Sequence, residues 1–228
     1  MNTLHIETPI HGRVLFEARS PDHLLVGFHG YAETAEVHLA ELERIPGIGE
    51  WSVAAVQALH PFYSKGGTVI GASWMTSLDR ELAIADNINY VRRVVAAVED
   101  RQSCLSGQEG KANQAGQAGL PVLHKVLIFL GFSQGVAMAA RAAGHIQASG
   151  LIMIGGDLPP DVRGRALPPA LLVRGKKDEW YSEEKFKEDL KFFEPEKVLV
   201  HDGGHEWNDA VRASAGEFLA TRKRSHPS

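Results

Sequence analysis

The sequence predicts one α/β domain built on a mostly parallel β-sheet, with helices on both faces of the sheet. Short apolar runs alternate along the chain with segments of helical periodicity, an order typical of strand–helix–strand units. The run at 125–130 (KVLIFL) is apolar on every side, as expected of a central strand covered by helices on both faces. A length of 228 residues fits a single domain with a large core, so we treat 1–228 as one unit.

The apolar runs place the strands, and spacing of three and four residues places the helices. We expect strands at 14–16, 24–28, 53–57, 125–130, 151–154, 171–173 and 197–200. We expect helices at 33–45, 79–102, 134–143, 182–193 and 206–221. Segment 106–119 has four glycines and no Leu, Ile, Val or Phe, which predicts a flexible surface loop, either a tolerated insertion or a lid.

Composition narrows the function class. The chain is 44% hydrophobic and 23% charged with a net charge of −4, so the basic excess of a nucleic-acid binder is missing. The single cysteine, Cys104, excludes an internal disulfide and a Cys-rich zinc module. The first residues lack a signal-peptide pattern, and no apolar run is long enough to span a membrane. We expect a cytoplasmic protein without stable membrane insertion, and the sequence does not decide whether it forms a homodimer.

A G-x-S-x-G pentapeptide at 131–135 carries the first chemical signal. Alone it is weak, but it directly follows the central apolar run and directly precedes the Ala-rich helical segment 136–140. In that context it forms a sharp turn that exposes the serine hydroxyl, and the small outer residues let strand and helix approach closely. Ser133 is therefore the candidate nucleophile.

A serine hydroxyl needs a base to take its proton, and this kind of turn is followed by a histidine on a later loop. His205 fits, because it follows the strand at 197–200 and the flexible pair Gly203-Gly204. His201 is the rival, but its place at the strand end gives it less freedom to reach the serine. The spacing of His201 and His205 also resembles a metal-ligand pair, although the glycines between them disfavour the helix that would align them.

The histidine in turn needs an acid to orient its ring and stabilise its protonated form. Asp178 lies in the loop after the strand at 171–173, with Glu179 as its nearest rival and Asp157 as the next. The order serine, acid, histidine along the chain is the order found in α/β folds whose nucleophile sits on a G-x-S-x-G turn.

Two backbone N–H groups should stabilise the negative oxygen of the reaction intermediate. One should belong to Gln134, directly after the candidate nucleophile, and the other should come from the loop after the strand at 24–28, which contains His29, Gly30 and Tyr31. Gly30 lets that loop turn inward, and we interpret His29 as a structural residue of the same loop.

These residues resemble the phospholipase/carboxylesterase family of α/β-hydrolases, which includes the acyl-protein thioesterases. The resemblance rests on His29-Gly30, on GFSQG at 131–135, on Asp178 after its strand and on Gly204-His205, and it extends from about 24 to 219. It implies a single-domain α/β-hydrolase fold with a minimal cap or none. It also implies hydrolysis of small-molecule carboxylic esters or thioesters without a metal or an organic cofactor.

The resemblance assigns roles residue by residue. It makes Ser133 the nucleophile, Asp178 the acid and His205 the base, with the N–H groups of Tyr31 and Gln134 as the oxyanion-hole donors.

The chain departs from the family at the places that shape the substrate site. Acyl-protein thioesterases usually carry H-G-L-G-D where this chain has His29 to Glu33, and their acid is usually followed by proline. Bulky side chains near these loops predict a shortened acyl pocket, which favours small or medium acyl groups, although each aromatic could instead be ordinary core packing. The candidate substrate-binding residues are His29, Gly30, Trp74, Met75, Trp180 and Tyr181.

Other functions stay open on the same residues. A thioesterase or lysophospholipase would take longer acyl chains, and a peptidase or lactone hydrolase could use the same three side chains. A non-catalytic binding protein is disfavoured, because such relatives usually lose a member of the triad and this chain has all three.

Overall fold

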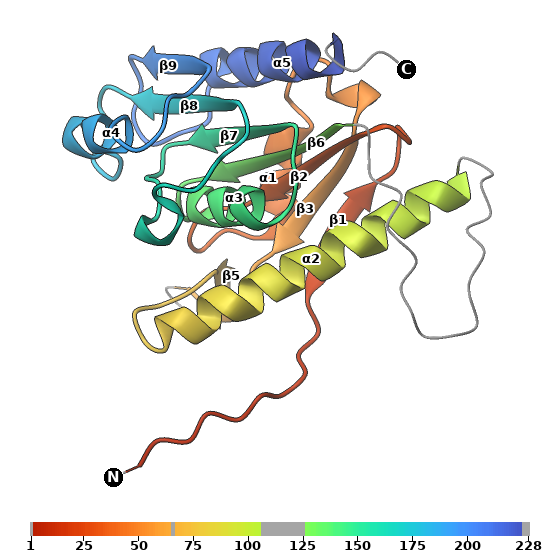
Figure 1. Ribbon diagram of the computed structural model, residues 1–228, viewed down its shortest axis with the longest axis vertical. Coiled ribbons are helices and arrows are strands. Elements are labelled where there is room, and N and C mark those ends of the chain that lie inside the picture. Colours follow the sequence, from red (N-terminus) through yellow and green to blue (C-terminus); the bar gives the residue numbers. More distant parts are fainter. Residues whose placement is uncertain (1, 65–66, 106–125, 225–228) are drawn as a thin grey trace.

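The computed structural model describes residues 2–64, 67–105 and 126–224 (Figure 1). The main sheet has seven strands in the order β1-β3-β2-β6-β7-β8-β9. Strand β1 pairs antiparallel with β3, and the other six run parallel to one another, which confirms the mostly parallel sheet. The strands are β1 (Arg13–Glu17), β2 (His23–Phe28), β3 (Ser52–Gln57), β6 (Val126–Phe132), β7 (Gly150–Ile154), β8 (Ala170–Gly175) and β9 (Lys197–His201).

Helices cover both faces of this sheet (Figure 1). Residues of α2 and α3 belong to the apolar cluster on one face, and residues of α1 and α5 belong to the cluster on the other. The helices are α1 (Ala35–Leu42), α2 (Arg80–Leu105), α3 (Gln134–His145), α4 (Glu183–Asp189) and α5 (Asp209–Arg224), with 3₁₀ turns η1 (Ile48–Glu50) and η2 (Pro160–Val162).

Strand β6 joins the two apolar layers, because every one of its residues is buried. Leu127 and Phe129 face the α2–α3 layer, whereas Ile128 and Leu130 face the α1–α5 layer. Alternate side chains of a strand point to opposite faces, so an all-apolar run is what a strand buried on both sides requires.

Several helix boundaries differ from those predicted, and side-chain caps explain two of them. Helix α1 starts at Ala35, because the Thr34 hydroxyl accepts a hydrogen bond from the Val37 N–H at 3.5 Å. Helix α5 starts at Asp209, because Asn208 Oδ1 accepts from the Val211 N–H at 3.0 Å. Helix α4 ends at Asp189, well before the predicted residue 193, and the proline at 195 disfavours helix in the residue before it.

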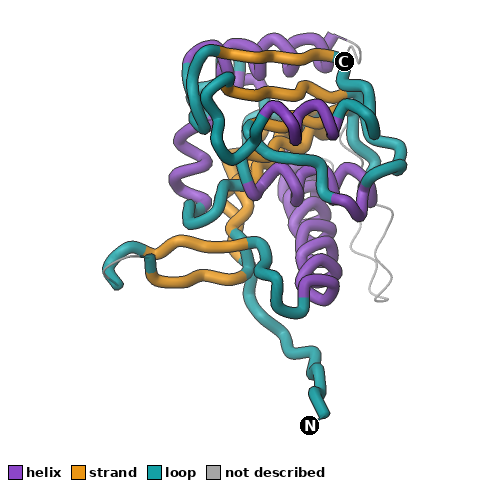
Figure 2. The backbone as a smooth tube through the Cα atoms, turned by 90° about the vertical axis from the view of Figure 1, so that its left-hand side faces the viewer, coloured by secondary structure: helices purple, strands orange, loops and turns teal. Residues whose placement is uncertain are grey.

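A two-stranded hairpin outside the main sheet was not predicted from the sequence. Strands β4 (His60–Tyr63) and β5 (Ile70–Ser73) pair antiparallel and stand apart from the seven-stranded sheet (Figure 2). Each strand contains a residue type that is depleted in strands, Pro61 in β4 and Gly71 in β5, so neither segment is recognisable as a strand from the sequence.

Two further expectations from the sequence concern a surface loop and membrane-spanning helices. The proposed surface loop at 106–119 lies outside the described residues. Among the helices of the described ranges, none has the length and apolar character needed to cross a membrane.

The parallel strands decide where the candidate site residues meet. Strands β2, β6, β7, β8 and β9 all end at the same edge of the sheet, and the loops that follow them carry Tyr31, Ser133, Gly155, Asp178 and His205. Ligand sites of α/β sheets lie at this carboxyl edge.

Candidate active site

Ser133 occupies a strained turn between β6 and α3. Its φ of 53° and ψ of −120° lie in a region that L-residues rarely adopt, and such strain collects at functional sites. A Cβ atom on Gly131 would lie 2.4 Å from the carbonyl oxygen of Gly135, and one on Gly135 would lie 2.0 Å from that of Phe28. Both glycines are therefore required sterically, and the turn holds Ser133 at the first residues of α3.

Asp178 and His205 are brought together by the loops after β8 and β9. Oδ2 of Asp178 lies 2.9 Å from Nδ1 of His205. The Asp178 side chain is 1% exposed and that of His205 is 21% exposed, so the acid is shielded while the imidazole can reach solvent and substrate. The backbone N–H groups of Trp180 and Tyr181 donate to Oδ1 of Asp178, both at 2.9 Å.

A pair of glycines after β7 places Ser133 beside this hydrogen-bonded pair. A Cβ on Gly155 would lie 3.3 Å from both Asp178 Oδ2 and His205 Nδ1, and a Cβ on Gly156 would lie 2.4 Å from the Ser133 carbonyl oxygen. The Ser133 hydroxyl makes no hydrogen bond within the described part of the chain. The contact between a catalytic serine and its base is often long in enzymes without substrate and shortens when substrate binds.

The rival residues His201 and Asp157 have other partners. Nδ1 of His201 accepts hydrogen bonds from the Gly203 N–H at 3.1 Å and lies 3.0 Å from Nδ2 of Asn208, so His201 braces the loop that carries His205. Asp157 is exposed and lies 3.5 Å from the ammonium group of Lys185. The described residues contain no group of three or more His, Cys, Asp or Glu side chains placed to hold a metal ion.

The loop after β2 lies against the nucleophile turn. A Cβ on Gly30 would lie 3.3 Å from the Cβ of Ser133, so the backbone directly before Tyr31 passes close to the serine. The Glu33 carboxylate accepts a hydrogen bond from the Gly30 N–H at 2.7 Å. Burial raises the pKa of Glu33, although the Gly30 hydrogen bond and the nearby His205 oppose that rise. No pattern in the sequence marks this role of Glu33.

His29 supports the same loop from below, fully buried. Its Nδ1–H donates to the Gly30 carbonyl at 2.7 Å, and its Nε2 accepts from the Ala58 N–H at 3.0 Å. Burial lowers the pKa of His29, which agrees with a neutral ring that both donates and accepts. These contacts match the structural interpretation of His29 and leave it no direct access to substrate.

The side chain of Gln134 ties the nucleophile turn to the segment after β5. Its Oε1 accepts from the Trp74 N–H at 3.1 Å, and its Nε2 donates to the Met75 carbonyl at 3.2 Å. The backbone N–H of Gln134 belongs to the first turn of α3, where N–H groups have no acceptor within the helix. It therefore remains available to an oxyanion.

Most of the aromatic side chains proposed to line the substrate site are buried supports. Trp74 is fully buried and donates from Nε1 to the His29 carbonyl at 2.9 Å. Tyr181 is fully buried and donates to Asp189 at 2.8 Å, and burial together with that carboxylate raises its pKa. Met75 is buried beside Arg141, with its sulfur 3.6 Å from the guanidinium. Trp180, 75% exposed, lines the cleft.

A cleft of about 260 Å³ opens at Ser133. Its two cationic residues are Arg80 and Lys185. Neither could be predicted from the sequence, because the hydrophobic pattern near them says nothing about side-chain direction. The cleft is lined by Arg80, Ser133, Gln134, Ala137, Gly155, Gly156, Asp157, Pro159, Pro160, Trp180 and Lys185.

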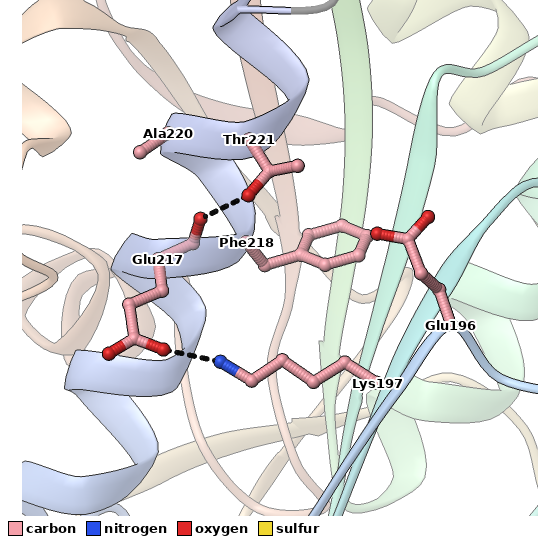
Figure 3. A pocket seen from close by; sticks show the side chains of 6 residues that line it. All are labelled: Glu196, Lys197, Glu217, Phe218, Ala220 and Thr221. Carbon is pink, nitrogen blue, oxygen red and sulfur yellow. Dashed lines mark hydrogen bonds and ion pairs between the residues drawn. The ribbon is translucent and has the colours of Figure 1, made fainter.

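A second groove, of about 350 Å³, lies between β9 and α5 and contains none of the candidate catalytic residues (Figure 3). Lys197 and Glu217 form an ion pair across it, and Thr221 donates to the Glu217 carbonyl at 3.0 Å. The third charged side chain of the groove, Glu196, pairs with Arg222. Because the groove's charged groups already have partners, the cleft at Ser133 is the stronger candidate for catalysis.

Comparisons with known proteins identify the family and the fold. The sequence profile of a family described as serine hydrolase (FSH1) matches residues 72–207, which is 136 of the 228 residues. That range contains the candidate nucleophile, acid and base. No curated protein matches the chain.

Solved structures share the fold at low sequence identity. Esterase PE8 is 21% identical with a TM-score of 0.60, covering 92% of this chain and 97% of its own. A Bacillus cereus carboxylesterase is 15% identical with a TM-score of 0.64, covering 92% and 94%. Zea mays acyl-protein thioesterase 2 is 17% identical with a TM-score of 0.60, covering 93% and 99%.

These neighbours agree with the resemblance drawn from the sequence and confirm the α/β-hydrolase fold. The profile match spans more than half of the chain and sets the family. The chain belongs to the serine hydrolase (FSH1) family.

Proposed function

We propose that this protein is a carboxylesterase that hydrolyses small esters through an acyl-enzyme on Ser133. The observation that carries the proposal is the Asp178–His205 hydrogen bond of 2.9 Å beside a serine in a strained turn. An acid, a base and a nucleophile on successive loops at one sheet edge are the parts that acyl transfer needs. Membership of a serine hydrolase family supports the same chemistry.

The first half of the reaction acylates the enzyme. Ser133 Oγ attacks the ester carbonyl carbon while its proton passes to Nε2 of His205, and Asp178 holds the Nδ1–H of the same ring. The N–H groups of Tyr31 and Gln134 donate to the oxyanion of the tetrahedral intermediate. His205 then returns the proton to the departing alkoxide, and the bond between the carbonyl carbon and the alcohol oxygen breaks.

The second half repeats these steps with water. His205 takes a proton from a water molecule, whose oxygen attacks the acyl carbon, and a second oxyanion forms in the same place. Collapse of this intermediate breaks the bond to Ser133 Oγ, which takes its proton back from His205. The products are a carboxylic acid and an alcohol, and the enzyme is regenerated.

The size of the cleft favours small substrates. Ligand pockets usually measure about 300–1,000 Å³, whereas a water occupies about 30 Å³ of the liquid. At about 260 Å³ the cleft falls just below the usual range for drug-sized ligands. A short acyl group with its alcohol fills such a space.

A longer acyl chain is the second candidate, because Trp180, which lines the cleft, is 75% exposed. An acyl chain too long for the cleft could lie against this apolar side chain, and the fold neighbours include an acyl-protein thioesterase from Zea mays.

The test is the initial rate of hydrolysis across 4-nitrophenyl esters from acetate to dodecanoate. Ser133→Ala should lower kcat by about 10⁴- to 10⁶-fold. Ser149→Ala is the matched control, because Ser149 precedes β7 at the opposite edge of the sheet. A peak at short chains supports the small esterase, and a peak at long chains favours the second candidate. Equal rates for Ser133→Ala and the wild type would remove both.

A further inference from the structure

The cleft beside Ser133 carries two cations and one anion. Arg80, Lys185 and Asp157 line it together. Lys185 lies 3.5 Å from Asp157 and also donates to the Trp180 carbonyl at 3.0 Å, so its charge is paired. Arg80 is exposed at the start of α2, and its guanidinium makes no hydrogen bond or ion pair within the described chain. The cleft therefore has one uncompensated positive charge.

The nearby acids do not supply the missing partner for Arg80. Asp161 acts on Arg80 only at longer range, because Arg141 holds the Asp161 carboxylate through two hydrogen bonds of 2.8 and 2.7 Å. Arg141 itself is fully buried, so this pair is fixed behind the cleft. On the opposite side, the Glu33 carboxylate is engaged by the Gly30 N–H.

An unpaired arginine on the wall of a cleft suits an anionic group. Its planar guanidinium presents donors that match a carboxylate in a two-pronged hydrogen bond. The same cleft contains Ser133, and its volume of about 260 Å³ keeps any bound group within a few bonds of the serine.

We propose that the substrates are esters that carry a free carboxylate a few bonds from the scissile carbonyl, bound by Arg80. This inference rests on the proposed esterase function and specifies its substrate class. The carboxylate belongs either to the acyl half or to the alcohol half, since Arg80 would recognise it in both. Neutral esters of the same size remain substrates, but without the Arg80 contact.

The experiment compares matched esters that differ in charge. Monoethyl succinate and ethyl levulinate have nearly the same shape, with a carboxylate in the acyl half of the first and a methyl ketone in that of the second. Sodium 4-acetoxybutanoate and 5-acetoxypentan-2-one make the same comparison in the alcohol half. Acid release in a pH-stat gives kcat/KM for each, and the readout is the ratio of charged to neutral substrate.

Arg80→Gln should lower that ratio by about ten- to a hundredfold in one of the two pairs, as expected for a lost charge-assisted hydrogen bond. Arg80→Lys keeps the charge but not the two-pronged geometry, so its ratio should lie between those of the wild type and of Arg80→Gln. Arg93→Gln is the matched control, because Arg93 is exposed on the same helix and does not line the cleft. Its ratio should equal that of the wild type.

Binding to Ser133→Ala separates this inference from the proposed hydrolysis. Calorimetry should show tighter binding of the charged ester than of the neutral ester, and adding Arg80→Gln should remove the difference. If Arg80-dependent binding persists while wild type hydrolyses no ester, Arg80 binds the carboxylate but the esterase proposal fails, and with it the assignment of these esters as substrates. If neutral esters are hydrolysed and Arg80→Gln leaves both ratios unchanged, the inference is overturned and the esterase proposal stands.

Discussion

Oδ2 of Asp178 lies 2.9 Å from Nδ1 of His205, while Oδ1 of the same carboxylate accepts two backbone hydrogen bonds. The donors are the N–H groups of Trp180 and Tyr181, and they fix the plane of the carboxylate. Arg174 steadies this loop from beneath, because its Nε donates to the Tyr181 carbonyl at 3.1 Å. The acid is thus oriented before any substrate arrives.

Asp178→Asn should lower kcat by about 10³- to 10⁴-fold with little change in fold. The asparagine oxygen can still accept from the two backbone N–H groups, which turns its NH₂ toward His205. That NH₂ cannot accept the Nδ1–H, so it favours the tautomer with the proton on Nε2, and such a ring cannot take the proton of Ser133. Hydrolysis of 4-nitrophenyl butyrate measures the loss.

Asp202→Asn is the control for this prediction. Asp202 is exposed on a neighbouring loop, where it pairs with Lys176 at 2.6 Å. It should keep the wild-type rate, since surface pairs of this kind contribute little. An Asp178→Asn enzyme with more than about a tenth of the wild-type kcat would contradict the assignment of the acid.

Substitutions of the histidine that ends β9 and of the histidine in the loop after it should have clearly different effects. His205→Gln should lose at least about 10³-fold in kcat, because it removes the base. His201→Gln should keep most of the activity and lower the free energy of unfolding by about 1 kcal/mol, because it loosens the bonds to Gly203 and Asn208. Rates and urea unfolding of both variants check this. The reverse pattern would make His201 the base.

Glu33 should position the oxyanion loop through its hydrogen bond to Gly30. Glu33→Ala should lower kcat by about ten- to a hundredfold at nearly constant KM, since a displaced oxyanion donor affects the transition state more than the bound ester. Glu33→Gln should restore much of the rate, because its side-chain oxygen can still accept from Gly30. If the glutamine variant is as slow as the alanine variant, the carboxylate charge matters rather than the hydrogen bond.

The buried side chain of His38 should make the fold sensitive to acid. Both of its ring nitrogens are buried without a hydrogen-bond partner in the described chain, and burial, with a smaller effect of His29, lowers its pKa from 6.5 to about 3. Between those values the unfolded chain binds a proton at His38 that the folded chain does not. The free energy of unfolding should therefore fall by about 1.4 kcal/mol per pH unit below about pH 6.5.

Replacing His38 should flatten this dependence. Between about pH 7 and 5, His38→Leu should lose about 2 kcal/mol less stability than the wild type, measured by urea unfolding. His60→Leu is the control, because His60 is exposed in β4, and its curve should run parallel to that of the wild type. A His38→Leu curve parallel to the wild type would show that His38 is not the group that titrates.

Most of the sheet and the loops that carry the candidate triad could be predicted from the sequence. The all-apolar run of β6, the GFSQG turn and the loops of Asp178 and His205 are local patterns whose order along a parallel sheet fixes which edge they share. The β4–β5 hairpin could not be predicted in this way, because its short strands contain Pro61 and Gly71 and show no regular alternation.

The direction of side chains was the second feature that could not be predicted from the sequence. Tyr181 lies three residues after Asp178 in the sequence, and Trp74 was also expected at the substrate site. Both are instead fully buried and hydrogen-bonded beneath the loops rather than lining the cleft. Glu33 and Arg80 carry no pattern that marks a site, because their roles come from contacts between distant segments. Those contacts depend on tertiary packing, which the hydrophobic period does not encode.

Covalent labelling of the nucleophile tests the central claim most directly. The wild type, treated with a fluorophosphonate and examined by intact-protein and peptide mass spectrometry, should gain one adduct, located on Ser133. Labelling should vanish in Ser133→Ala and slow strongly in His205→Gln, while Ser149→Ala should label like the wild type. An adduct on another residue, or labelling that persists in Ser133→Ala, would contradict the account.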